Sequence, residues 1–144
     1  MTEAAAPGRN SWRIAGLALV FVWFLAGGIG HFVLTKTFAA IVPPYIPYPR
    51  EMVYVTAVCE IAGALALLYE PLRRVSGFCL MALAICVTPV HIEMLIQSQK
   101  YQALGPAFLW GRLILQPIFI WIIWWSTKPH RMFEKSDLAA HHRL

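Results

Sequence analysis

Charged residues are scarce in this sequence. Asp, Glu, Lys and Arg make up 13% of the 144 residues, whereas 59% of the residues are hydrophobic. Soluble domains carry about 25% charged and about 45–50% apolar residues. Because charged side chains are the ones that face water, 12 basic and 7 acidic residues cannot cover so apolar a chain. The composition therefore excludes an ordinary soluble enzyme and a disordered protein, and it favours an integral membrane protein.

Cysteine is also rare, and its positions form no redox motif. Cys59, Cys79 and Cys86 all fall in apolar segments, and no C-x-x-C pair is present. Cys79 and Cys86 would lie about 10 Å apart on one helix, whereas a disulfide needs Cα atoms within about 7 Å. The sequence also lacks a P-loop, a Rossmann fingerprint and a G-x-S-x-G motif. These absences exclude a secreted disulfide scaffold and leave no standard catalytic signature.

Four long apolar runs predict the fold. Their lengths of 18 to 22 residues suit helices that cross a membrane, which need about 17–25 residues; they are Ile14–Leu34, Met52–Tyr69, Ser76–Gln97 and Ala107–Thr127. None of them alternates as a barrel strand does, and backbone groups in lipid must be paired within their own segment. We therefore predict an all-α antiparallel bundle of four transmembrane helices over residues 14–127. A tail of residues 1–13 precedes it, and a basic tail of residues 128–144 follows it.

Basic residues beside the predicted helices indicate their orientation, since Lys and Arg favour the cytoplasmic side. One side of the bundle carries three of them, namely Lys36, Arg50 and Lys100, and the other side carries eight, namely Arg9, Arg13, Arg73, Arg74, Lys128, Arg131, Lys135 and Arg143. Both termini are therefore predicted to be cytoplasmic. Because the aromatic residues lie in the spans and not beside a basic patch, we expect no nucleic-acid partner.

Polar residues inside the spans are the candidate functional site, because ionisable groups in a membrane are costly and mark functional positions by default. Six such residues are present: His31, Glu60, His91, Glu93, Arg112 and Gln116. With a rise of 1.5 Å per residue, all six fall in the outer half of the bundle. We predict a polar pocket there, suited to a quinone carbonyl, to another polar headgroup or to the gating of a proton.

Two other interpretations of these polar residues stay open. Glu60 and Arg112 are expected at similar depth, so they would form a central ion pair that locks the bundle without any ligand. A metal is the second alternative, because two histidines and two glutamates are potential ligands. However, the Glu-x-x-His pairs of di-iron bundles are missing, and His91–Glu93 lacks the P-C-x-x-C half of a zinc deaminase. We therefore expect no metal.

A proline-rich stretch lies between the first two predicted spans. Residues 42–49 read Val-Pro-Pro-Tyr-Ile-Pro-Tyr-Pro, and proline removes a donor and restricts the residue before it. A continuous helix is therefore excluded. We predict a stiff extended cap at the outer interface, formed by Pro43, Pro44, Tyr45 and Pro47; the alternative is a rigid connector with no further role.

The order of several short motifs resembles the DoxX-like family of small four-helix membrane proteins. The resemblance covers residues 14–127 and rests on Gly30-His31-Phe32, Ile41-Val42-Pro43-Pro44-Tyr45-Ile46-Pro47, Glu60-Ile61-Ala62-Gly63-Ala64, Pro89-Val90-His91-Ile92, Leu109-Trp110-Gly111-Arg112-Leu113 and Gln116-Pro117. It implies a four-helix bundle in a bacterial inner membrane. Members of that family have been linked to quinone-coupled sulfur oxidation and to oxidative-stress complexes, and animal relatives act as receptor-assembly factors. The absence of paired cysteines argues against a thiol mechanism in this chain.

The resemblance and the predicted pocket together give the expected function. We expect a multi-pass inner-membrane protein that is a small subunit of a quinone- or redox-associated membrane complex, with a quinone as the cofactor that the resemblance suggests. The alternative is a non-enzymatic accessory or assembly factor that binds a lipid, or a membrane or periplasmic protein. No single residue is assigned a catalytic role.

Overall fold

The computed structural model describes residues 8–99 and 105–128, and these residues form helices and turns with no β-strand. Their order is α1 (Gly8–Val33), α2 (Thr35–Ala39), α3 (Pro49–Leu68), the 3-10 helix η1 (Glu70–Leu72), α4 (Arg73–Ile96) and α5 (Pro106–Thr127). Within the described residues, four helices are long and apolar enough to cross a membrane. The prediction of an all-helical chain with four candidate spans is therefore confirmed.

The boundaries of these helices agree closely with the apolar runs. Each predicted span ends within one residue of the end of α1, α3, α4 or α5. Helix α1 begins earlier than expected, at Gly8, so it includes part of the segment that was predicted to be a tail. The remainder of that tail, and the C-terminal tail after Lys128, lie outside the described residues.

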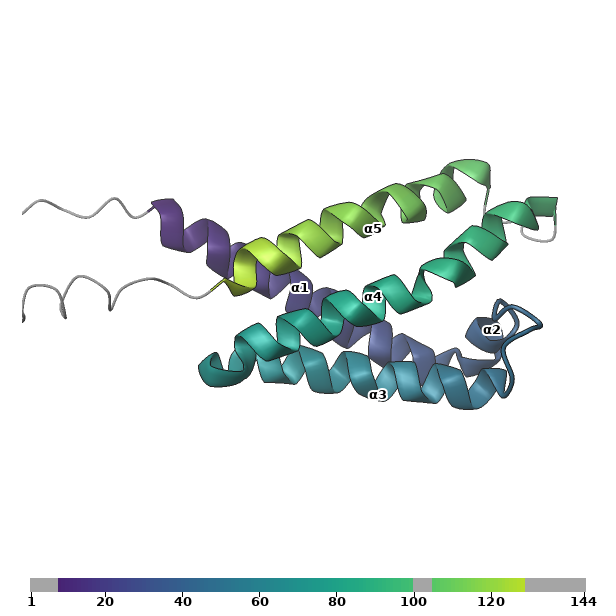
Figure 1. Ribbon diagram of the computed structural model, residues 1–144, viewed down its shortest axis with the longest axis horizontal. Coiled ribbons are helices and arrows are strands. Elements are labelled where there is room, and N and C mark those ends of the chain that lie inside the picture. The colour runs from purple at the N-terminus through teal and green to yellow at the C-terminus, as the bar shows by residue number, and fades with distance from the viewer. Residues whose placement is uncertain (1–7, 100–104, 129–144) are drawn as a thin grey trace, which may run out of the picture.

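The four long helices run alternately in opposite directions (Figure 1). The start of α1, the η1 turn and the end of α5 lie at one end of the bundle, which we call the terminal end. Helix α2 and the turns that precede α3 lie at the opposite end, which we call the loop end (Figure 1). Each long helix contacts two others, so that α1, α3, α4 and α5 follow one another around the bundle, and α2 packs on α1 and α3.

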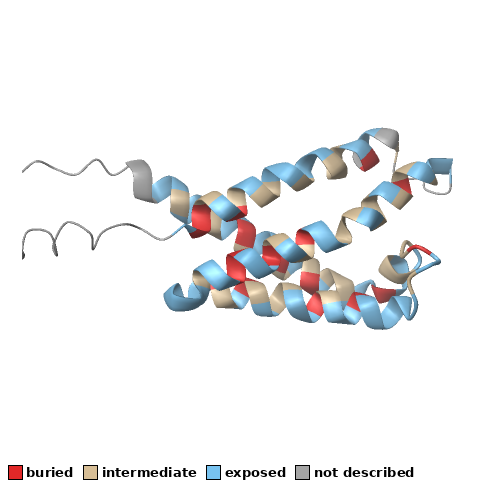
Figure 2. Cartoon of the chain, in the orientation of Figure 1, coloured by how far each residue is buried: buried red, intermediate tan, exposed pale blue. Residues whose placement is uncertain are grey.

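The hydrophobic core lies toward the terminal end. Six buried residues form it, with contributions from all four long helices: Val20, Phe24, Ala64, Leu67, Leu80 and Ile123. Figure 2 shows that many of the buried residues gather where the helices cross in this half of the molecule. Buried apolar residues also occur toward the loop end, namely Val53, Ala57, Met94 and Leu109, but they lie outside this cluster.

Hydrogen bonds from side chains to backbone carbonyls join neighbouring helices at the terminal end. The Arg13 guanidinium donates to the carbonyl oxygen of Ser126 at 3.2 Å and to that of Lys128. Between α4 and α3, the Ser76 hydroxyl donates to the Gly63 carbonyl at 2.6 Å. Carbonyls in the last turn of a helix have no partner within the helix, so Arg13 supplies a donor that the end of α5 lacks.

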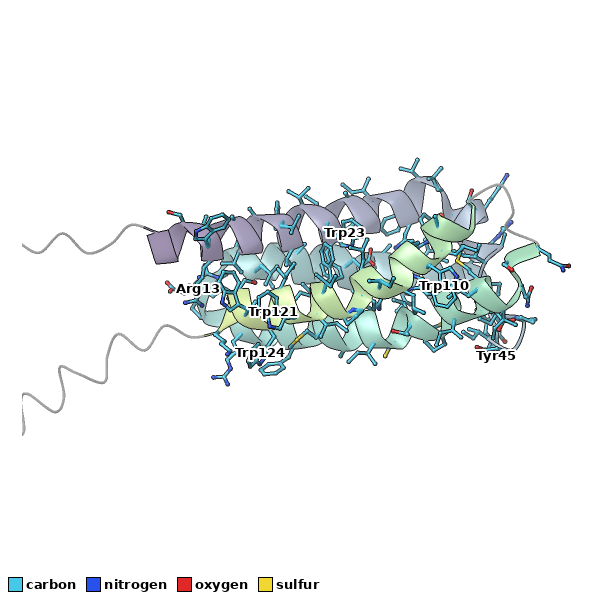
Figure 3. The ribbon with its side chains drawn as sticks, turned by 90° about the horizontal axis from the view of Figure 1, so that it is seen from above. Arg13, Trp23, Tyr45, Trp110, Trp121 and Trp124 are labelled. Carbon is cyan, nitrogen blue, oxygen red and sulfur yellow. The ribbon has the colours of Figure 1, made fainter. Side chains whose placement is uncertain are left out.

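The outward faces of the helices are apolar. In the most apolar window of each span, only 17–28% of the residues are buried inside the molecule. Trp121 and Trp124 lie near Arg13 at the terminal end, whereas Tyr45 lies at the loop end (Figure 3). Aromatic residues at both ends and an apolar surface between them are typical of helices that contact lipid.

The segment between α1 and α3 differs from the extended cap that was predicted. It begins with the five-residue helix α2 and continues through turns, in which the Ile46 amide donates to the Pro43 carbonyl at 3.0 Å. The prediction was wrong because proline forbids a long helix but permits tight turns, which satisfy the amides that remain. Pro43 is fully buried, whereas Pro44, Tyr45 and Pro47 are exposed.

Candidate functional site

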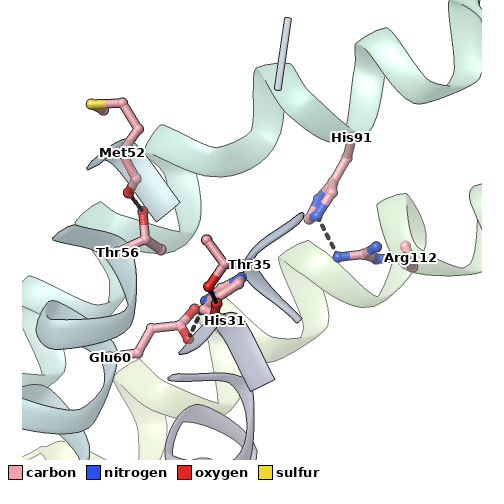
Figure 4. Close-up of polar contacts among 7 residues, drawn as sticks. All are labelled: His31, Thr35, Met52, Thr56, Glu60, His91 and Arg112. Carbon is pink, nitrogen blue, oxygen red and sulfur yellow. Dashed lines mark hydrogen bonds and ion pairs between the residues drawn. The ribbon is translucent and has the colours of Figure 1, made fainter. Parts of the chain in front are cut away.

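Two helices meet at a close contact between His31 of α1 and Glu60 of α3. His31 Nδ1 and Glu60 Oε2 are 3.1 Å apart, and the side chains are only 17% and 12% exposed (Figure 4). Both atoms are buried, and neither meets the geometry of a hydrogen bond with any described residue. The two atoms are therefore close enough for an electrostatic contact, but the ring is not aligned to donate along the line that joins them.

Glycine in α1 makes room for this carboxylate. A Cβ atom at Gly27 would lie 3.0 Å from Glu60 Oε2, and a Cβ atom at Gly28 would lie 2.9 Å from the carbonyl oxygen of Ala57. Small residues let membrane helices approach one another closely. Gly27 lies one turn before His31 on the same helix face, so α1 presents both the space for the carboxylate and its cationic or hydrogen-bonding partner.

Helix α2 covers His31 from the loop end. The ring of Phe38 packs edge-on against the imidazole, with ring centroids 4.3 Å apart and an interplanar angle of 75°. The Thr35 hydroxyl donates to the carbonyl oxygen of His31 at 2.8 Å (Figure 4). Thr35 is the first residue of α2, so α2 begins beside the pair. The imidazole is thus held by a carboxylate on one side and an aromatic edge on another.

The second pair joins α4 and α5. Arg112 Nη2 and His91 Nε2 are 3.0 Å apart, and both residues are half-buried (Figure 4). A guanidinium group only donates, so His91 Nε2 accepts and the proton of the neutral ring is on Nδ1. His91 Nδ1 is buried and has no partner among the described residues. The Gln116 side chain lies near this ring, but it does not meet the geometry of a hydrogen bond with Nδ1. This pair therefore contains a buried N–H donor that makes no well-aligned hydrogen bond with a described residue.

Gln116 joins α5 to α4 by hydrogen bonds, one helical turn closer to the terminal end than Arg112. Its amide donates to the Thr88 hydroxyl at 3.2 Å and to the carbonyl oxygen of Ala84, to which Thr88 also donates at 3.1 Å. Proline residues follow directly in both helices, at positions 89 and 117. Proline removes a hydrogen bond from a helix interior, so Gln116 bridges the helices where each is locally weakened.

The structure separates the residues that were expected to form one ion pair. Glu60 faces His31, and Arg112 faces His91, so the predicted Glu60–Arg112 pair is wrong. Helix packing explains the difference, because α1 contacts α3 and α4 contacts α5, whereas α3 and α5 do not contact each other. Glu93 belongs to neither pair, since its carboxylate accepts a hydrogen bond from Gln97, the residue that follows the end of α4.

Two features of the site were not found from the sequence. Phe38 and Thr88 contact the polar residues directly, but one lies in a segment that was expected to be a loop and the other is a common residue type in apolar helices. A signal for Thr88 existed in its position beside Pro89, because side-chain hydroxyls often satisfy the carbonyls that proline leaves free in membrane helices.

Metal-ligating and thiol side chains do not cluster in the described residues. No group of three or more His, Cys, Asp or Glu side chains that could hold a metal ion occurs in that part of the chain. The three cysteines are free and exposed on the outside of α3 and α4. The chemistry that the described residues bring together is therefore hydrogen bonding and charge, supplied by two histidines, one carboxylate and one guanidinium.

Comparison with known proteins identifies the family of the chain. Residues 18–127, which include the His31–Glu60 and His91–Arg112 pairs and Gln116, match the family described as a domain of unknown function (DUF8561). No curated protein and no solved structure matches the chain.

Proposed function

The chain belongs to the DUF8561 family, and we propose that it is a DoxX-like integral membrane protein whose two polar pairs bind the head of a quinone. In this proposal it is a small subunit of a quinone- or redox-associated complex in a bacterial inner membrane. The observation that carries the proposal is a set of buried polar atoms that make no hydrogen bond with the described residues, namely His31 Nδ1 and Glu60 Oε2, which face each other at 3.1 Å, and His91 Nδ1.

The orientation in the proposal follows from charge. The terminal end would face the cytoplasm, because eight flanking Lys and Arg residues belong to that side and three to the other. The loop end, with α2 and both polar pairs nearer to it, would face outward. Reporter fusions at Glu70 and at Pro47 are expected to report opposite sides of the membrane. If both report the same side, the assignment of the spans is refuted.

A quinone head matches the chemistry of the two pairs. Buried polar groups are nearly always hydrogen-bonded, and an unmet donor in an apolar setting costs about 1–3 kcal/mol. His91 Nδ1–H needs an acceptor, and a quinone oxygen is an acceptor on an apolar ring. The apolar tail of such a ligand would lie against the exposed hydrophobic faces of the helices. The DoxX-like resemblance, with its link to quinone-coupled oxidation, supports the same ligand.

The test is to identify what the purified protein binds. Extraction of the protein from membranes and mass spectrometry of its lipids should detect a quinone in stoichiometric amount. The variants Glu60→Gln and His91→Phe should reduce that amount at least several-fold. Glu93→Gln is the matched control, because Glu93 lies outside both pairs, and it should retain the quinone. Absence of any quinone, with a fully folded protein, would refute the proposal.

A second function is supported by a different observation. Each charged group of the two pairs already faces a partner on a neighbouring helix, so the pairs also suit a purely structural lock. The protein would then be a non-enzymatic accessory or assembly factor that binds a lipid or a partner membrane protein. Stoichiometric co-purification of a membrane protein, with no quinone present, would favour this second function.

A further inference from the structure

The two ring nitrogens of His31 lie in different surroundings. Nδ1 is buried and faces Glu60 Oε2 at 3.1 Å. Nε2 is not among the buried partnerless atoms of the described residues, and no described residue makes a hydrogen bond to it, so it keeps accessible surface. The imidazole therefore turns one nitrogen toward the protein and leaves the other accessible to another molecule.

The charge of the carboxylate favours one of these nitrogens as the site of the proton. Glu60 Oε2 lies 3.1 Å from Nδ1, and an ionised carboxylate attracts a proton but cannot donate one. A neutral His31 is therefore favoured with its proton on Nδ1, although the N–H does not point along the line to Oε2. The other nitrogen, Nε2, is then a lone-pair acceptor, because the partner of one ring nitrogen sets the state of the second. The edge of Phe38, 4.3 Å away between ring centroids, restricts the ring from turning over.

We propose that Glu60 is a positioning residue that holds His31 Nε2 as a hydrogen-bond acceptor, so that the site prefers the reduced, hydroxyl-bearing ring of a quinol to the oxidised quinone. This inference rests on the proposed function. A quinol hydroxyl donates to Nε2, whereas a quinone oxygen has only lone pairs and would face another lone pair there. The hydroxyl oxygens of the quinol still accept hydrogen bonds, so the N–H group at His91 Nδ1 can donate to the reduced ring as well.

Gly27 provides a way to move the carboxylate without removing it. A methyl group at Gly27 would lie 3.0 Å from Glu60 Oε2, the oxygen that faces His31. Since this contact would be tighter than nine in ten real Cβ contacts, Gly27→Ala requires the oxygen to shift by a few tenths of an ångström, which alters its position beside the ring. Gly30 is the matched control, because it lies in the same helix and a Cβ atom there meets nothing within 4 Å.

The first experiment reads the tautomer of His31 directly and needs no ligand. Nitrogen chemical shifts of ¹⁵N-histidine-labelled protein in lipid, above the ordinary titration range of histidine, distinguish a proton on Nδ1 from one on Nε2. The His31 signals are assigned by their loss in His31→Gln. We expect the Nδ1–H form in the native protein and in Gly30→Ala, and a mixture of tautomers in Gly27→Ala and Glu60→Gln. A dominant Nε2–H form or a doubly protonated ring in the native protein overturns the inference.

The second experiment measures the preference between redox forms. A decyl-tailed benzoquinone and its hydroquinone, the latter kept reduced under anaerobic conditions, are titrated into the protein in lipid nanodiscs. We expect the hydroquinone to bind roughly tenfold more tightly, since one mismatched buried hydrogen bond has about this effect. The ratio should fall toward one in Gly27→Ala and Glu60→Gln, and it should be unchanged in Gly30→Ala.

The outcomes separate this inference from the function on which it rests. If neither ring binds the native protein, the quinone function fails. If both rings bind equally, the function stands and the redox preference fails. If the hydroquinone is preferred but Gly27→Ala keeps the full preference together with the native tautomer signal, then Glu60 is not the residue that sets it.

Discussion

Replacement of Gly77 by alanine tests how tightly α4 and α5 meet at the terminal end. A Cβ atom at Gly77 would lie 2.6, 2.8 and 2.9 Å from Oγ1, Cγ2 and Cβ of Thr127. Thr127 is only 6% exposed, and its hydroxyl donates to the carbonyl oxygen of Ile123 at 2.7 Å. Rotation of the threonine moves Oγ1 and Cγ2 but leaves Cβ in place, so the two helices must separate.

The expected loss in the free energy of unfolding follows from comparison with Gly111, a second helical glycine. An extra methyl group in a filled site costs about 1–3 kcal/mol, whereas alanine is about 1 kcal/mol better than glycine in a helix interior. Gly111→Ala gains the higher helix propensity of alanine without crowding a neighbour, because a Cβ atom there meets nothing within 4 Å. Gly77→Ala should therefore be less stable than Gly111→Ala by about 1–3 kcal/mol.

Reversible unfolding in mixed micelles, with the fraction of denaturing detergent as the variable, measures this difference. Thr127→Ala removes two of the three crowding atoms, so Gly77→Ala should be less damaging in that background, and the double-mutant cycle should show favourable coupling. If Gly77→Ala is as stable as Gly111→Ala, or if the cycle shows no coupling, the close approach of α4 and α5 at this point is wrong.

Three further predictions concern the polar contacts. Glu60→Gln and His31→Gln should couple by about 1 kcal/mol in a double-mutant cycle of unfolding, whereas Glu60→Gln and Arg112→Met should be additive within about 0.5 kcal/mol; the reverse pattern would restore the Glu60–Arg112 pair. Gln116→Leu should lower the free energy of unfolding by about 0.6–1.7 kcal/mol, because two hydrogen bonds between helices are lost. Arg13→Gln should speed amide hydrogen exchange in the last turn of α5, where the carbonyls lose a charged donor; unchanged exchange there would contradict that role.

The sequence predicted the helices well because each long helix coincides with one apolar run of a length that could cross a membrane. An apolar run that must cross hydrocarbon has a narrow range of lengths, so each run ends within one residue of the corresponding helix end. The start of α1 was missed by six residues, from Gly8 to Ile14, because polar residues can extend a helix beyond the apolar run. Composition marks the part of a helix that suits hydrocarbon, but it does not mark the helix end.

The partners of the polar residues could not be predicted in the same way. Residue spacing gives the depth of a side chain and the residues that share its face, but it does not say which helices are neighbours. Glu60 was therefore matched to a cation at similar depth, and the nearer partner on α1 was overlooked. The clue was Gly27, one turn before His31, since a glycine on the same face allows a second helix to bring a carboxylate within reach.

The contact of Arg13 with the end of α5 also bears on how the protein is made. Its acceptor carbonyls belong to residues 113 and 115 positions later in the chain. Ribosomes add about 5–20 residues per second, so roughly 6–23 seconds pass between synthesis of the donor and of its acceptors. During that interval the Arg13 guanidinium has neither of these carbonyls to donate to. Closure of the bundle thus coincides with the end of the last helix, and a nascent chain that stops before Ser126 lacks the contact that joins its first helix to its last.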